Sequence, residues 1–300
     1  MLIARPIFNP TEDDNIKRLR TYYNYLRCVN KFLINEYSNW QQYAGYCISK
    51  TSKIQGKPDL DLDWINRWLK IAWNTEYLIN AGPDQVELIR INNQWLPIQS
   101  YYSIYAASEA FTYAIDKGKS GSHAKARKKL TTFLSRTKIK PWNFICDGTK
   151  NNLSFPNFPT ITNFPNNLTR QDVIPHEMIA TCLRAEHKHR INENFVKRKK
   201  YFKKDFNPGL SSLLHFFYRL RIKSNYRDID LFIMDASDTL IIEFANSLKE
   251  IVFWFLVLTE IYLIRRCKKR IIIISIEDYL SINPHHKLLR NRADYYTMNI

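Results

Sequence analysis

The sequence predicts an all-α protein, and three features support that fold class. Apolar residues make up 45% of the 300 residues and aromatic residues 14%, which is enough to fill the core of a folded protein. Only 7 glycines and 12 prolines are present, fewer than a protein of many short strands and tight turns needs. Apolar residues also recur at intervals of three and four, the spacing of helices with one buried face.

Two helices are expected in the first third of the chain. Residues 12–50 carry apolar side chains at helical spacing. A second helix begins near Asp63, which is placed to cap it, and is closed by Gly82 and Pro83.

A pair of helices is expected next. Residues 86–102 could hold a short hairpin or a loop, and Pro97 introduces a helix that ends at Lys117. A further helix starts at Ser122, so that His123 is its first residue. The two helices would form a helical hairpin.

The middle of the chain has a different amino-acid composition, which is rich in proline. Residues 140–175 contain five prolines and the dipeptide Phe-Pro three times. Because proline restricts its own backbone and that of the preceding residue, no regular helix is expected here. We expect an irregular segment whose phenylalanines dock on the domain surface. Helical texture returns at about His176 and continues to Asn207.

Two helices and a tail are expected in the last third. Residues 210–232 carry an apolar stripe, and the following helix is entered through Asp235 or Ser237. That helix is apolar nearly all round up to Ile264, so it should lie at the centre of a bundle. Residues 271–276 fit either a strand or a helix continuation, and the last residues resemble a partly ordered tail.

Charge is the clearest global feature. The 45 Lys and Arg residues exceed the 28 Asp and Glu residues by 17, which indicates a polyanionic partner such as RNA or another nucleic acid. Residues 184–204 hold nine basic and two acidic residues beside three aromatic ones, a composition typical of single-strand contact surfaces. The expected nucleic-acid-binding residues are Arg190, Lys197, Arg198, Lys199, Lys200, Lys203 and Lys204. The alternative is a solvated helix face.

Other features argue against several classes of site. The five cysteines are odd in number and never spaced as CxxC, so neither a zinc site nor a disulfide framework is indicated, and we expect a reducing, cytoplasmic location. The N-terminus has no signal-peptide pattern, and the most apolar segment, residues 251–264, is too short to span a membrane. Glycine-rich nucleotide loops, nucleophile elbows and HExxH motifs are absent, so no metal or cofactor is expected.

Two separated segments form a recognisable pair of motifs. The first consists of Tyr101-Tyr102, Tyr105-Ala106-Ala107 and Glu109-Ala110 on one helix, then Ser122-His123 at the start of the next. The second is LRIKSNY, from Leu220 to Tyr226, followed by Asp228 and a long helix from Ile241 to Leu263. In this order the pair resembles the prokaryotic HEPN superfamily of small helical bundles. LRNRADY at 289–295 fits the second motif more closely, but no long helix follows it.

The resemblance implies a HEPN-like helical bundle with a Pro-rich and basic insertion between its halves. Residues 1–139 would supply the N-terminal helices and the first half of the bundle, and residues 205–264 the second half. Residues 140–204 would form the insertion, and residues 265–300 a basic C-terminal tail.

The resemblance also implies an RNA-targeting function. The protein would be a metal-independent ribonuclease or toxin of a bacterial antiviral defence or toxin–antitoxin system. It would act as a homodimer or beside a nucleotidyltransferase antitoxin or another defence partner. The alternative is a non-catalytic nucleic-acid-binding or scaffold subunit of a defence complex.

Such a ribonuclease needs a base for the 2′-hydroxyl, an acid for the leaving oxygen and a cation for the phosphate. His123 is the candidate base, because a helix N-terminus disfavours the cationic imidazole. Arg219 or Arg221 would hold the phosphate, and Tyr226 would orient it or stack on a base.

Nuclease members of the superfamily carry an arginine and a histidine four to six residues apart on one helix. Arg184 and His189 have that spacing and form the alternative catalytic pair.

Each candidate also has a packing interpretation. His123 would then only be the first residue of a helix in a hairpin. Arg219 and Arg221 would form ion pairs with Glu109 or Asp228 inside the bundle. The tyrosines would pack in the core.

Overall fold

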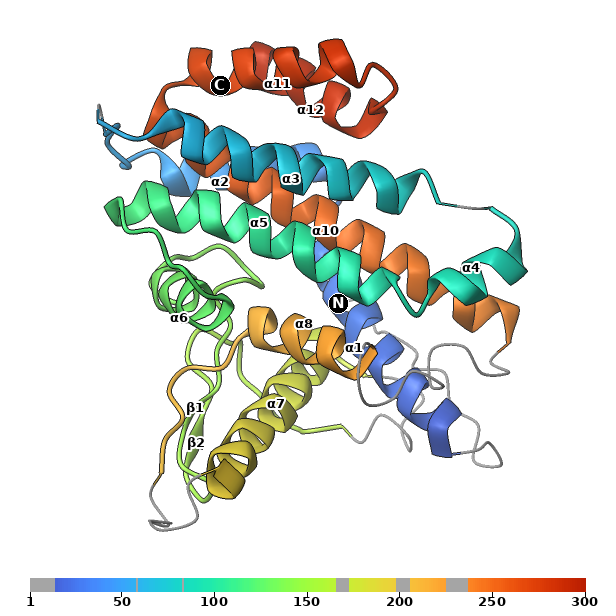
Figure 1. Cartoon of the computed structure of the whole chain (residues 1–300). Coiled ribbons are helices and arrows are strands. Elements are labelled where there is room, and N and C mark those ends of the chain that lie inside the picture. Colours follow the sequence, from blue (N-terminus) through green and yellow to red (C-terminus); the bar gives the residue numbers. More distant parts are fainter. Residues whose placement is uncertain (1–13, 58, 83, 166–172, 198–205, 225–236) are drawn as a thin grey trace. The chain divides into compact units, whose positions relative to one another are not determined.

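A computed structural model of the chain describes residues 14–57, 59–82, 84–165, 173–197, 206–224 and 237–300. Helices dominate these residues, and two short strands accompany them (Figure 1). The expected all-α fold class is therefore confirmed.

The chain forms two compact units, each made of segments that alternate along the sequence. Unit 1 comprises residues 1–36, 83–98 and 131–248, and unit 2 comprises residues 37–82, 99–130 and 249–300. The positions of the units relative to one another are not determined.

Unit 2 is a helical assembly around the second part of α10. It contains α2 (Trp40–Thr51), α3 (Leu62–Asn80), most of α5 (Leu96–Asp116), the first turns of α6 (His123–Leu134), part of α10 (Asp238–Cys267), α11 (Lys269–Ile282) and α12 (Lys287–Asn299). In Figure 1, α3, α5 and α10 run side by side. Almost every side chain between Ile251 and Ile264 is buried, as expected for a central helix.

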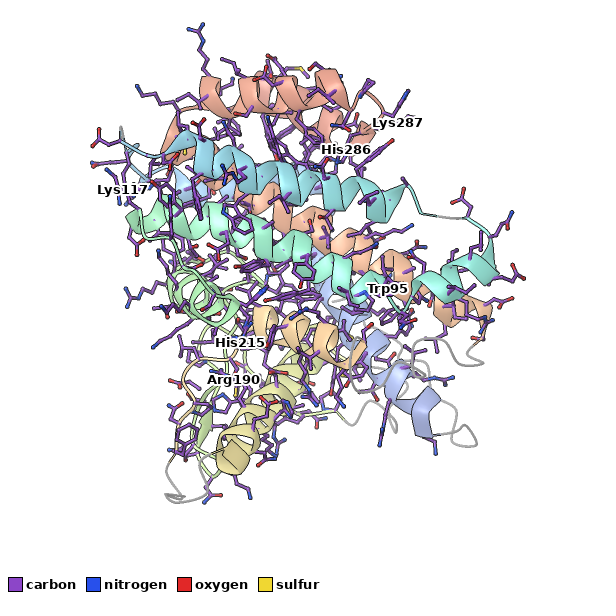
Figure 2. The ribbon with its side chains drawn as sticks, in the orientation of Figure 1. Trp95, Lys117, Arg190, His215, His286 and Lys287 are labelled. Atoms are coloured by element: carbon purple, nitrogen blue, oxygen red, sulfur yellow. The ribbon has the colours of Figure 1, made fainter. Side chains whose placement is uncertain are left out.

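The last two helices of unit 2 pack on α3. Ser275 of α11 donates a hydrogen bond to Oδ1 of Asn66 at 2.8 Å. His286, labelled in Figure 2 at the junction of α11 and α12, is buried, and its Nε2 lies 3.2 Å from the carbonyl oxygen of Trp73. The structure differs here from the sequence prediction of a partly ordered tail. It also assigns residues 271–276 to a helix and not to a strand.

Unit 1 combines helices with a short hairpin. It contains most of α1 (Asp14–Tyr37), α4 (Val86–Asn92), the end of α6, α7 (Pro175–Lys197), α8 (Leu213–Ile222), the start of α10, β1 (Asp147–Gly148) and β2 (Leu153–Ser154). The two strands pair antiparallel, with Asp147 opposite Ser154. Helices α7 and α8 pack against each other.

Three helix boundaries differ from those expected. The helix predicted over residues 12–50 is interrupted at Ser38, whose φ of 59° is left-handed, and Asn39 caps α2. Asp61, and not Asp63, caps α3, because its side chain accepts a hydrogen bond from the Trp64 backbone nitrogen at 3.0 Å. Residues 86–92 form the helix α4 where a hairpin or loop was expected.

Of the phenylalanines in the three Phe-Pro dipeptides, Phe158 docks as expected, whereas Phe164 is exposed. Phe158 stacks on the buried Phe144 with ring centroids 4.2 Å apart. Phe155 contacts both Phe158 and Phe164, with centroids 5.9 and 5.1 Å apart. Within its described residues, the segment from Lys140 to Pro165 contains no helix, which agrees with its proline content.

A buried charge network joins α3, α10 and α12 in unit 2. Arg292 donates to both carboxylate oxygens of Glu76 at 2.7 Å and to those of Glu260 at 2.8 and 3.0 Å. Trp73 and Tyr296 donate to Glu260 at 2.8 and 2.7 Å. Burial alone would raise the pKa of Glu76, but Arg292 and His286 outweigh it and hold that pKa below its usual range.

Replacing Arg292 with alanine should lower the free energy of unfolding by about 3–5 kcal/mol, because two buried carboxylates would lose their cation. Arg290→Ala is the matched control, since Arg290 is exposed on the same helix and should change stability by no more than about 0.5 kcal/mol. Denaturant unfolding followed by circular dichroism measures both. Equal unfolding midpoints for the two variants would contradict a stabilising role for Arg292.

Candidate functional site

The hairpin of α5 and α6 presents His123 in unit 2. Helix α5 ends before Lys117, labelled in Figure 2, whose φ of 65° is left-handed. Gly121 also has a φ of 65°, which favours glycine, and turns the chain toward α6. The Ser122 hydroxyl then accepts a hydrogen bond from the Lys125 backbone nitrogen at 3.3 Å. The predicted helix start at His123 is thereby confirmed.

His123, Tyr101 and Arg127 form a hydrogen-bonded trio. Nδ1 of His123 lies 2.9 Å from the hydroxyl of the buried Tyr101, and Nη1 of Arg127 donates to the same oxygen at 3.3 Å. His123 and Arg127 are four residues apart on α6, so they share one face of the helix. A guanidinium can only donate, so the Tyr101 oxygen accepts from Arg127. In the tautomer in which Nδ1–H of His123 also donates to this oxygen, Nε2 is the unprotonated nitrogen that can accept a proton.

Aromatic rings extend from His123 across α5 and α3. The ring of Tyr105 lies 3.9 Å from that of His123, and Tyr102, 38% exposed, lies at 6.0 Å. Trp68 follows at 5.6 Å from Tyr105, and Trp64 at 5.8 Å from Trp68. We call Tyr102, Tyr105, Trp68 and Trp64 the aromatic row. All four are at least partly exposed. Of the three tyrosines for which packing in the core was considered, Tyr101 is buried, whereas Tyr105 is partly exposed and Tyr102 is exposed.

Lys119 lies beside the aromatic row, and further lysines are exposed on α6. Nζ of Lys119 is 4.2 Å from the ring centroid of Trp64, a cation–π contact. Lys125 and Lys128 are exposed on α6.

Burial and the neighbouring Glu109 raise the pKa of Tyr105, so its hydroxyl stays protonated at neutral pH. A surface of this kind can stack nucleobases and contact phosphates.

Arg219 and Arg221 lie in the last turn of α8, in unit 1. Nη1 of Arg219 is 3.5 Å from Oε2 of Glu186, and the guanidinium of Arg221 is 5.9 Å from the ring centroid of Tyr218. Of the two expected partners, Glu109 instead accepts a hydrogen bond from Ser120, and Asp228 lies outside the described residues.

The remaining member of the predicted site, Tyr226, also lies outside the described residues. His123 belongs to unit 2, whereas Arg219 and Arg221 belong to unit 1. A site shared by His123 and either arginine therefore stays a prediction.

The alternative pair on α7 is not brought together. The Arg184 guanidinium lies 4.7 Å from the ring centroid of Phe164, whereas Nε2 of His189 lies 3.2 Å from Oε1 of Glu193. Residues five apart on a helix point about 140° apart, which explains the separate partners.

Arg190, labelled in Figure 2, is engaged inside unit 1. It donates to the carbonyl oxygens of Pro208, Gly209 and Leu210 at 2.7 to 3.0 Å and to the Ser211 hydroxyl at 2.6 Å. It thus holds the segment that leads into α8. Its expected contact with nucleic acid stays a prediction. Lys197 ends α7, but its side chain lies outside the described residues, as do Arg198, Lys199, Lys200, Lys203 and Lys204.

Comparisons of the chain with protein-family models, curated proteins and solved structures found no match. In the part of the chain that the structure describes, the protein belongs to the all-α class. Among the helices of that part, none is long and apolar enough to cross a membrane. Across the same residues, no group of three or more His, Cys, Asp or Glu side chains is placed to hold a metal ion.

Sequence reasoning missed two residues of these clusters. Arg127 follows His123 at the spacing of one helical turn, so a search for the arginine–histidine pair in either order would have found it. Glu186 is one of two acids in the basic segment, but nothing in the sequence predicts that it is buried beside Arg219.

Burial raises the pKa of Glu186 to about 7, against the opposing effects of Arg219 and Arg190. A carboxyl that binds its proton more tightly in the folded state favours folding at low pH, and this contribution is lost as the pH rises from about 4.5 to about 7. Glutamine at this position does not titrate. The change in the free energy of unfolding caused by Glu186→Gln should therefore be about 3 kcal/mol more favourable at pH 8 than at pH 4.5.

Melting temperatures measured from pH 4.5 to pH 8 test this expectation. Glu87→Gln, at an exposed position of α4, is the control and should follow the parent at every pH. A Glu186→Gln curve parallel to that of the parent would show that Glu186 does not titrate in this window.

Proposed function

We propose that this protein is a HEPN-like RNA-targeting protein that cuts RNA without a metal ion. The setting would be a bacterial defence or toxin–antitoxin system in the cytoplasm, with a second copy or a nucleotidyltransferase antitoxin as partner. The observation that carries the proposal is the trio of His123, Tyr101 and Arg127. It combines a histidine and an arginine on one helix, as in nuclease members of the superfamily, although in the reverse order.

The trio supplies the groups that RNA cleavage through the 2′-hydroxyl needs. His123 accepts the proton of the 2′-hydroxyl while its oxygen forms a bond to phosphorus and the bond to the 5′-oxygen breaks. The leaving 5′-oxygen takes a proton from water, and the hydroxide that forms recovers the proton held by His123. Arg127 offsets the charge that develops on the phosphorane, and Tyr101 positions both side chains.

The surroundings of the trio support RNA as the substrate. The aromatic row offers rings on which unpaired bases can stack, and Lys119, Lys125 and Lys128 offer contacts to phosphates. The net charge of +17 favours association with a polyanion at long range.

Purified protein incubated with total RNA or tRNA in EDTA should release fragments that end in 2′,3′-cyclic phosphates. His123→Ala and Arg127→Ala should each lower the cleavage rate by roughly two orders of magnitude or more, because each removes a group that acts in the transition state. His285→Ala and Arg290→Ala are matched controls, since both residues are exposed elsewhere in unit 2.

The outcomes separate the candidate sites. Loss of cleavage in His123→Ala but not in Arg127→Ala would transfer the phosphate contact to Arg219 or Arg221. Full activity in both variants would move the site to Arg184 and His189. Absence of cleavage with every RNA would exclude the ribonuclease.

A second candidate function is a non-catalytic subunit that binds nucleic acid within a defence complex. The aromatic row favours it, because such a surface binds single strands whether or not His123 reacts.

Tyr102→Ala should weaken binding of single-stranded RNA in EDTA by roughly 5- to 150-fold, the effect of losing one stacked base. Fluorescence anisotropy with a labelled oligonucleotide measures the affinity. Trp95, labelled in Figure 2, is 51% exposed in unit 1, and Trp95→Ala controls for the loss of any exposed ring. Equal affinities for the two variants would exclude the aromatic row as the binding surface.

A further inference from the structure

A small pocket in unit 1 contains a buried carboxyl group. It lies between α1, α7 and α8 and has a volume of about 130 Å³. Its walls include the rings of Tyr22, Tyr25 and Phe216, and its polar groups include Glu186 and Arg219. A cavity of roughly 150 Å³ accepts one benzene molecule, so this pocket has space for the ring edge of a planar ligand.

Two polar atoms of the pocket residues Glu186 and Arg219 are buried without a hydrogen bond to the described residues. The side chain of Glu186 is 5% exposed, and its Oε2 has only the 3.5 Å contact with Arg219 and no hydrogen bond to the described residues. Nε of Arg219 is likewise buried without a hydrogen bond in that part of the chain. Buried polar atoms usually have hydrogen-bond partners, so this acceptor and this donor are suited to hydrogen bonds with a polar ligand in the pocket.

A planar ligand that complements Glu186 and Arg219 needs an edge with one hydrogen-bond acceptor next to two donors. A carboxylate with two oxygens can accept from two adjacent N–H groups, and a guanidinium donates to a neighbouring oxygen. Guanine has this sequence of groups on its Watson–Crick edge, namely O6, N1–H and N2–H. Adenine and cytosine each offer one amino donor beside a ring acceptor, so they would leave one carboxylate oxygen unpaired.

The walls of the pocket suit a nucleotide. The rings of Tyr25 and Phe216 meet edge to face with centroids 6.0 Å apart, and Tyr22 lies 6.5 Å from Phe216. Exposed Arg18 lines the pocket as well, where it can contact a phosphate.

We propose that this pocket binds a guanine base through Glu186 and Arg219. The proposal of a guanine site is argued from the residues and distances of the pocket alone. Only the choice of RNA as the source of the base rests on the proposed function. The other source of the same chemistry is a free guanosine nucleotide.

Guanine recognition requires the ionised carboxylate, which makes binding dependent on pH. The charged and titratable groups around Glu186 are Arg219 from α8, Arg18, Tyr22 and Tyr25 from α1, and Cys182, Arg190 and Glu193 from α7. Burial raises the pKa of Glu186 to about 7, so the carboxylate fraction falls as the pH falls below 7. Affinity for guanine should therefore drop roughly tenfold from pH 8 to pH 6.

Titration of the whole protein with guanosine 5′-monophosphate, followed by calorimetry at pH 8, tests the pocket directly. We expect binding that is roughly ten- to hundredfold tighter than that of the adenosine and cytidine monophosphates. Glu186→Gln should abolish this preference, because its amide offers one acceptor and one donor group in the same volume. Ala185→Leu should remove binding by filling the pocket, and Glu87→Gln should bind as the parent does.

The same variants with RNA distinguish the two sources. If guanosine monophosphate binds and G-containing oligonucleotides bind no better than others, the pocket takes a free nucleotide, and the role of RNA at this site is overturned. If RNA binds or is cut while the monophosphates show no preference for guanine, the pocket proposal fails and the proposed function stands. Equal guanine binding by the parent and Glu186→Gln would overturn the role of Glu186.

Discussion

The architecture of unit 2 depends on one constraint, the enclosure of a helix segment that is apolar around nearly its whole circumference. Between Ile251 and Ile264, α10 buries almost every side chain, so neighbouring helices must cover all of its faces. Glu260 lies within this segment and is itself buried. A carboxylate in such surroundings needs a cation, which α12 supplies as Arg292. The covering helices therefore include α12, and the charge fixes which face of α12 turns inward.

The hairpin of α5 and α6 follows from the same enclosure. One face of α5 is packed in the core, where Phe111 stacks on Tyr262 of α10 with centroids 3.9 Å apart. Its other face carries Tyr102 and Tyr105, which remain partly exposed. Because the packed face fixes the orientation of α5, the tyrosines and His123 are held at the surface by the core behind them. This is how a packing requirement positions a candidate reactive group.

The buried carboxyl groups of Glu260 in unit 2 and Glu186 in unit 1 differ in their hydrogen bonds. Glu260 accepts hydrogen bonds from Arg292, Trp73 and Tyr296, whereas Oε2 of Glu186 has no hydrogen bond to the described residues and lies 3.5 Å from Nη1 of Arg219. A satisfied network stabilises a core, whereas a buried group without strong partners costs free energy. That cost is the physical reason why we propose a binding role for Glu186 and a stabilising role for Glu260.

Local spacing and apolar composition were enough to predict the helical class, the central position of α10, the hairpin that begins α6 at His123 and the docking of Phe158. The sequence did not determine the helices of residues 265–300, since Arg292 in a basic segment has the composition of a surface residue until Glu76 and Glu260 are known to face it. The partners of Arg219 and Arg190 were likewise unpredictable. Only the tertiary structure decides such pairs, because the energy of a charge depends on its burial and on neighbours far away in the sequence.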